Sequence, residues 1–307
     1  MINPTSRRSF LSSTLLTALG GTRIIEADDA GELDVLITGG TVYDGSGGPG
    51  IRADVGVKGD RISVMGIAVG TRRAKRVIDA KGCAVSPGFI DPHTHTDSHL
   101  IENPKAESAI RPGVTTHISG NCGSSPFIKH AASAGRDLRT FYSRLESQGI
   151  AINYDTLAGH GALRAHAMGT LDRAPSASEL GRMKSALRAT LEAGGMGLST
   201  GLWYAPGSFA KADEIVELCR ELLPFDAVYA THMRDEGDRV LESVKEALDT
   251  AERSGARLQI SHLKTMYSRN HSKLPSMLDS IESAKRRGIR VLADRYPYIA
   301  SSTSLNV

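Results

Sequence analysis

Four histidines and one cysteine lie at positions from which they could bind a metal ion together. His93 and His95 stand one residue apart in GFIDPHTHTD, directly after an apolar run, and alternate residues of an extended chain point to the same side. His232 and His262 end two later predicted strands, and Cys122 follows an earlier one in the glycine-flanked loop SGNCGSSP. Imidazole nitrogens and a thiolate sulfur are ligands that suit zinc. The sequence therefore predicts a zinc site that joins distant parts of the chain.

The segments that must position these residues alternate between strand and helix from Phe89 onward. Apolar runs bounded by turn residues predict strands at residues 88–93, 114–120, 152–159, 195–200, 227–232, 257–262 and 290–295. Apolar residues at three- and four-residue spacing predict helices, most clearly at residues 177–195, 212–223 and 238–255. Cys219 falls on the apolar stripe of the second of these helices, so we expect it in the core.

The placement of the polar residues decides between the two folds that repeated strand and helix units allow, a doubly wound sheet and a (β/α)8 barrel. In a barrel the functional residues lie where strands end, and the histidines and the cysteine lie at such ends. No G-x-G-x-x-G follows the first of these strands, so a dinucleotide-binding sheet has no support. We expect an α/β fold with an incomplete TIM-type (β/α)8 barrel of about seven strands.

The chain divides into three segments of different character. In residues 1–30, Arg7 and Arg8 precede an apolar stretch too short to span a bilayer, which resembles a twin-arginine export signal; the alternative is a frayed basic terminus with a chance arginine pair. Residues 31–88 predict a small β-sandwich module, and residues 89–307 predict the metal-binding barrel. We expect export by the twin-arginine machinery to the periplasm or the extracellular space, or a cytoplasmic location if the signal is not used.

Composition excludes several classes of partner. The 37 basic and 34 acidic residues leave a net charge of +3, which gives no electrostatic footprint for nucleic acid or an anionic membrane. We expect a small-molecule substrate, no nucleic acid and no stable membrane insertion. The three cysteines are an odd number at wide spacing, which argues against a disulfide framework. Cys83, in the turn KGCAV, is expected to be structural.

Six motifs of residues 34–304 resemble, in order and spacing, those of the N-acyl-D-amino-acid deacylases (D-aminoacylases) of the amidohydrolase superfamily. They are GFIDPHTHTD, SGNCGSSP, TGLWYAPG, YATHMRDE, ISHLKT and DRYPYIASST. Many superfamily members bridge two metals with a lysine on the fourth strand, but GMGLSTGLWY has none, and the resemblance gives the bridging position to Cys122. It implies that Cys122, His232 and His262 hold a tight zinc, and that His93 and His95 form a weaker second position.

The same resemblance implies hydrolysis of the amide bond of N-acyl-D-amino acids, which releases a carboxylate and a D-amino acid. Three protein ligands leave room for a water molecule, whose pKa zinc lowers to about 7. Lys264 and Tyr204 are implied to bind the substrate α-carboxylate, with Tyr298 as a further candidate; the alternative for Lys264 is an ordinary solvated lysine. His160 either lines the barrel mouth or braces a loop. No role is expected for His99, His117, His130, His166 and His271.

The resemblance also implies a general base, an aspartate at the end of an eighth strand, which would lie beyond Val307. Asp294 belongs to the seventh-strand motif DRYPY and is not expected to replace it. We expect a C-terminally truncated deacylase with activity at least about three orders of magnitude below that of a full-length relative, because a positioned base contributes about 10²–10⁴-fold. The alternatives are a non-catalytic zinc-binding remnant and another amidohydrolase such as a cyclic amidase, which would need a different bridging ligand.

Overall fold

The computed structural model describes residues 31–67, 69–128 and 134–303. The expected export signal, residues 1–30, and His130 lie outside the described residues. The chain separates into two compact units, residues 1–87 and residues 88–307. None of the described helices combines the length and the apolar character needed to cross a bilayer.

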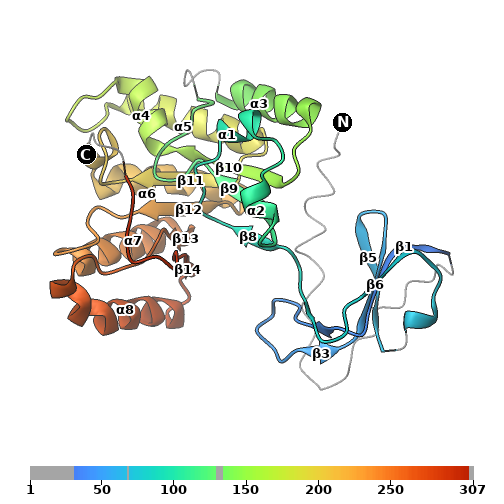
Figure 1. Cartoon of the computed structure of the whole chain (residues 1–307). Helices are drawn as coiled ribbons and strands as arrows, with labels where there is room; N and C mark the ends of the chain where they lie inside the picture. The colour runs from blue at the N-terminus through green and yellow to red at the C-terminus, as the bar shows by residue number, and fades with distance from the viewer. Residues whose placement is uncertain (1–30, 68, 129–133, 304–307) are drawn as a thin grey trace. The chain divides into compact units, whose positions relative to one another are not determined.

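Two small sheets make up the described part of the first unit (Figure 1). Their strands run in the orders β5-β4-β1-β6 and β3-β2-β7. The strands are β1 (Leu33–Thr38), β2 (Thr41–Val42), β3 (Ile51–Arg52), β4 (Asp54–Lys58), β5 (Arg61–Gly66), β6 (Ala74–Asp79) and β7 (Ala84–Val85). Leu33, Leu36 and Val64 form a small core with Val69. Cys83 is exposed, and its carbonyl accepts the Thr41 N–H at 3.0 Å.

A sheet of seven parallel strands organises the second unit, in the order β14-β13-β12-β11-β10-β9-β8 (Figure 1). The strands are β8 (Phe89–Asp91), β9 (Val114–Ser119), β10 (Asn153–Gly159), β11 (Gly197–Gly201), β12 (Val228–His232), β13 (Arg257–Ile260) and β14 (Val291–Ala293). Each expected strand is therefore present. A doubly wound sheet reverses its strand order at a switch point, whereas this order follows the chain without reversal. The expected incomplete barrel is confirmed.

Helices cover the outer face of this sheet. They are α1 (His99–Glu102), α2 (Glu107–Ile110), α3 (Ala134–Gln148), α4 (His160–Met168), α5 (Ala177–Glu192), α6 (Ala212–Cys219), α7 (Val240–Ser254) and α8 (Leu274–Arg286), with short 3-10 segments η4 (Gly207–Phe209), η5 (Arg220–Phe225) and η6 (Ser268–Lys273). Ser176 and Glu179 form a capping box that begins α5, as expected for serine followed by glutamate three residues later. The helix predicted at residues 212–223 ends earlier, because it tightens to a 3-10 form after Cys219 ahead of Pro224.

Alternate residues of each strand face opposite sides of the sheet, one side packed against the helices and the other facing the inside of the barrel. Leu198, Tyr229 and Leu258 are register partners on β11, β12 and β13, and all are buried in the core beneath the helices. Cys219 lies in the same core, as expected. His232, at an odd number of residues from Tyr229, lies on the inner side at the carboxyl end of β12. The fold thus directs the candidate ligands to one end of the sheet.

Candidate metal centre

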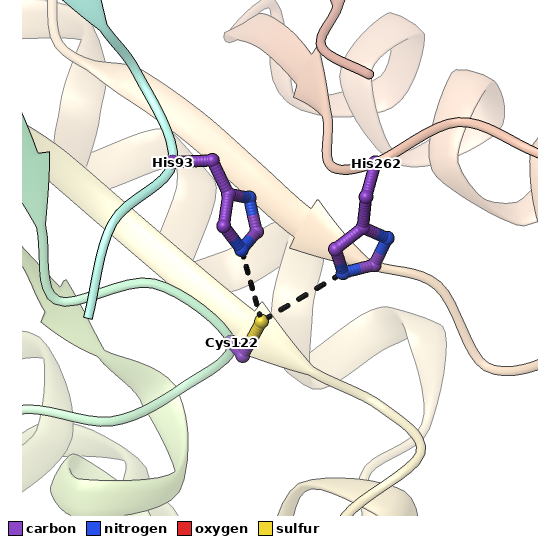
Figure 2. Close-up of side chains that lie close together, drawn as sticks. All are labelled: His93, Cys122 and His262. Carbon is purple, nitrogen blue, oxygen red and sulfur yellow. Dashed lines mark hydrogen bonds between the residues drawn. The ribbon is translucent and has the colours of Figure 1, made fainter. Parts of the chain in front are cut away.

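The Cys122 thiol lies among three imidazoles from distant parts of the chain. Its Sγ is 3.5 Å from His93 Nε2, 3.6 Å from His232 Nδ1 and 3.9 Å from His262 Nε2. Figure 2 shows the rings of His93 and His262 next to each other, both directed toward the Cys122 sulfur. These residues follow or end strands β8, β9, β12 and β13. The structure therefore brings together four of the five predicted ligands.

His95 lies beside this group. Its ring centroid is 5.4 Å from that of His93, in an edge-on arrangement, and the residue is exposed. Between them, Thr94 turns the other way, is buried, and donates to the Ile118 carbonyl at 3.1 Å. The two histidines are therefore neighbours, but His93 lies against the thiol whereas His95 lies farther out.

Close backbone packing holds the cysteine loop in place. Cys122 has φ 55° and His262 has φ 38°, a left-handed conformation that non-glycine residues rarely adopt and that often marks functional sites. Gly123 N–H donates to Ser199 Oγ at 3.0 Å, and a Cβ added at Gly201 would lie 2.2 Å from the Cys122 carbonyl oxygen. The loop therefore lies directly on the end of β11, which fixes the direction of the thiol.

Two carboxylates that the sequence prediction did not include hold the histidines. Asp294, directly after β14, accepts the His262 N–H at 2.6 Å and the Gln259 side-chain amide at 2.8 Å, and it lies 3.5 Å from His93 Nδ1. Glu236 Oε1 is 2.6 Å from His262 Nδ1. Asp294 lies in the motif DRYPY and Glu236 in YATHMRDE. An acidic residue directly after a barrel strand is itself a sequence signal of a functional site.

Burial sets the protonation of the site. Burial, together with the negative charges of Glu236 and Asp294, raises the pKa of the Cys122 thiol to about 12. Burial lowers the pKa of His232 to about 3, so its imidazole is neutral at physiological pH. Neutral imidazole is the form that binds metals.

The donor set fits a zinc ion. Donor atoms of His93, Cys122 and His262 lie within 4.8 Å of one another, as do those of His232, Glu236 and His262. His232 Nε2 is buried without a hydrogen-bond partner among the described residues. Nitrogen and sulfur donors at one end of a barrel match the preferences of zinc.

The predicted substrate-binding residues lie in different surroundings. The Tyr204 ring is 4.8 Å from that of His232, and its hydroxyl is 3.1 Å from Thr303 Oγ1. The side chain of Lys264 is 10% exposed and pairs with Glu236, so it is not the solvated lysine considered as the alternative. Tyr298 is 70% exposed. A residue that the sequence prediction missed, Tyr296, has its ring centroid 5.5 Å from the Lys264 ammonium.

The remaining histidines take structural or surface positions. His160 is fully buried at the start of α4 and its Nε2 is 2.8 Å from Glu214 Oε1, so it braces the fold. His117 is buried, with its Nδ1 3.2 Å from Thr96 Oγ1. The others that the structure describes are exposed: His99, His166 and His271.

Comparison with known proteins agrees with this geometry. A model of the amidohydrolase family matches residues 76–257. The chain is 37% identical over 291 residues to the D-aminoacylase of Alcaligenes xylosoxydans xylosoxydans, covering 90% of this chain and 60% of that protein. It is 39% identical over 287 residues to the N-acyl-D-glutamate deacylase of the same organism, covering 89% and 59%.

A solved structure is similar over the same part of the chain. The N-acyl-D-glutamate deacylase of Bordetella bronchiseptica, complexed with zinc and a phosphonate inhibitor, matches with a TM-score of 0.81 and 37% identity over 87% of this chain and 59% of that one. The chain therefore spans about three fifths of the length of these relatives.

Proposed function

Because the chain belongs to the amidohydrolase family, we propose that it carries the zinc site of a hydrolase that cleaves the amide bond of N-acyl-D-amino acids. Water is added across the carbon–nitrogen bond, and a carboxylate and a D-amino acid are released. The observation that carries the proposal is the Cys122 thiol within 3.9 Å of nitrogen atoms of His93, His232 and His262. The similar deacylases that act on N-acyl-D-amino acids, one of them solved with zinc, support this substrate class.

Cys122, His232 and His262 are proposed to hold the tight zinc, and His93 with His95 the weaker second position. The thiol supports this division, because a thiolate is the softest and most strongly binding donor of the group. Zinc supplies Lewis acidity, which polarises a carbonyl and lowers the pKa of water. Asp294 keeps the His262 backbone in place by accepting its N–H at 2.6 Å.

Lys264, Tyr204 and Tyr298 are proposed to bind the α-carboxylate of the substrate. The positions of the first two support this, since Lys264 Nζ lies 3.0 Å from His262 Nδ1 and the Tyr204 ring packs on His232. An ammonium and a phenol beside the metal ligands would hold an anionic group next to the scissile amide. The exposed ring of Tyr298 would have to turn toward the site when substrate binds.

The experiment loads the purified chain with one equivalent of zinc and supplies N-acetyl-D-methionine or its L enantiomer. We expect zinc-dependent release of methionine from the D form, blocked by a chelator and restored by added zinc. The matched control is Cys122→Ala, which should release none above the background of the buffer. Equal release from both enantiomers, no release from either, or release that survives the chelator would contradict the proposed function.

We also propose that residues 1–30 direct export by the twin-arginine machinery. Support comes from the Arg7–Arg8 pair in SRRSFL, the type of pair that this pathway reads. Replacing both arginines with lysine should leave the protein in the cytoplasm, as cell fractionation would show. Export that persists in the double variant would contradict this proposal.

A further inference from the structure

Glu236 lies between a metal ligand and a buried lysine. Its side chain is 3% exposed, with Oε1 2.6 Å from His262 Nδ1 and Oε2 paired with the Lys264 ammonium. From this geometry we infer that Glu236 is a positioning residue with two tasks: it fixes the tautomer of His262 and it neutralises Lys264 beside the metal position. The inference rests on the proposed zinc site.

The first task follows from the distances at His262. Its Nδ1 lies 2.6 Å from a carboxylate oxygen of Glu236 and 3.0 Å from Nζ of Lys264, and it cannot donate to the first while accepting from the second. A carboxylate is an acceptor without a proton of its own, and hydrogen bonds to a charged group are the shorter ones. The inference therefore places the proton of His262 on Nδ1, 2.6 Å from the Glu236 carboxylate. The lone pair of Nε2 is then directed at Cys122 Sγ, 3.9 Å away.

The second task follows from the position of the ammonium. Lys264 Nζ lies within 3.0 Å of both Nδ1 and the carbonyl oxygen of His262, so a cation bound at His262 Nε2 would stand one imidazole ring away. Two cations at this separation repel each other, and the repulsion is larger where burial lowers the effective dielectric constant. The Glu236 carboxylate cancels the charge of Lys264 and removes this obstacle to metal binding.

Glu236 acts from outside the metal's own ligands. The donor atoms of His232, Glu236 and His262 lie within 4.8 Å of one another, so direct ligation is the competing arrangement. Glu236 Oε2 already pairs with the Lys264 ammonium, and Oε1 lies 2.6 Å from His262 Nδ1. A carboxylate that receives the second N–H of a metal-binding histidine is the usual outer partner of such a ligand.

The two tasks predict opposite effects for the two partners. Glu236→Gln keeps an oxygen that accepts the His262 N–H but leaves the Lys264 charge uncancelled, so zinc affinity should fall about 10–100-fold, the usual range for outer partners of metal ligands. Lys264→Met leaves the carboxylate and removes the repelling charge, so zinc affinity should stay equal or rise. The double variant, with neither charge, should recover most of the loss of Glu236→Gln.

The experiment measures the zinc dissociation constant of the full chain by competition with a chromophoric chelator, for the wild type, both single variants and the double variant. The absorption spectrum of the cobalt(II)-loaded chain gives a second readout, because its visible bands report the number and type of ligands. Glu246→Gln is the matched control. It breaks another partly buried pair, with Arg234 at 2.9 Å, and should leave zinc affinity unchanged. Circular dichroism confirms that each variant is folded.

Each outcome decides a different point. Unchanged zinc affinity in Glu236→Gln would overturn the inference. Equal losses of zinc affinity in Glu236→Gln and Lys264→Met would also overturn it, because a purely structural ion pair is broken equally by removing either partner. A changed cobalt spectrum in Glu236→Gln would overturn it in favour of direct ligation. Wild-type chain that binds no zinc would overturn the proposed function itself. If Glu236→Gln fails to fold, the double variant with its charges balanced decides: a loss as large as that of a ligand substitution overturns the inference.

Discussion

Replacing Cys122 with alanine should weaken zinc binding by about two to three orders of magnitude. The thiol lies 3.5, 3.6 and 3.9 Å from nitrogens of three histidines, so its loss removes the donor that all of them face. Structural zinc sites with four ligands bind with about 10–16 kcal/mol, which is about 2.5–4 kcal/mol per ligand. Since about 1.4 kcal/mol is a factor of ten, one lost ligand corresponds to about 10²–10³-fold in the dissociation constant.

Three variants make this prediction specific. Cys122→Ala introduces no new steric conflict, because alanine has a smaller side chain than cysteine and would adopt the same left-handed conformation at φ 55°. His95→Ala removes an exposed ring that lies beside the group, and should change the dissociation constant of the tight site little. Cys83→Ala removes an exposed thiol in the other unit and controls for nonspecific binding to cysteine. Chelator competition gives the affinity, and elemental analysis after dialysis gives the zinc retained per chain.

Equal losses in Cys122→Ala and His95→Ala would refute the reasoning, since they would mean that the thiol is no more central than the outer histidine. So would full zinc retention in Cys122→Ala. A loss that appears only in Cys83→Ala would place the metal outside the barrel altogether.

Two further predictions concern a buried charge and the proton of the thiol. Glu214→Gln removes the carboxylate that pairs with Arg164 at 2.6 Å. Because this arginine is fully buried, the free energy of unfolding measured in a urea titration should fall by about 3–5 kcal/mol. The control Arg173→Ala breaks an exposed ion pair and should change the free energy of unfolding far less. Zinc affinity should rise about tenfold per pH unit from pH 7 to 8 and fall as the pH is lowered, because binding must displace the proton of Cys122, whose pKa burial raises to about 12. His232, whose pKa burial lowers to about 3, releases none, so a slope near two, or near zero, would contradict this assignment.

The sequence was sufficient to predict the strands and the barrel. Each strand of the second unit is a short apolar run that ends in a polar or glycine-rich turn, and the structure has a strand at every predicted position. Helix periodicity was equally informative, since α5 and α7 lie within the predicted ranges. Helix α6 ends earlier than predicted because apolar spacing alone does not distinguish an α-helix from the 3-10 turn that follows Cys219.

The roles of Glu236 and Lys264 could not be predicted in the same way. Both lie in loops after strands, where side-chain direction depends on local backbone angles such as the φ of 38° at His262. Apolar periodicity carries no information on such angles. Family resemblance assigned Lys264 to the substrate, but only coordinates show that Glu236 already pairs with it.

The short distance between His93 and Asp294 shows that metal binding at this site depends on the curvature of the seven-stranded sheet. They follow β8 and β14, the two edge strands of the seven-stranded sheet. In a flat sheet, six spacings of about 4.8 Å would separate these edges by about 29 Å. Nevertheless His93 Nδ1 lies 3.5 Å from Asp294 Oδ1, so the sheet curls until the carboxyl ends of its first and last strands meet.

The same curl brings His93 to the Cys122 thiol, 3.5 Å away, and the thiol to the two histidines that follow β12 and β13. An ion held by residues from β8, β9, β12 and β13 would bind this curved form and not a flattened or unfolded one. By mass action such an ion stabilises the form that it binds. Strands β8 and β14, the outermost of the seven among the described residues, are therefore tied to each other through the site. Zinc affinity and the resistance of the barrel to unfolding should change together.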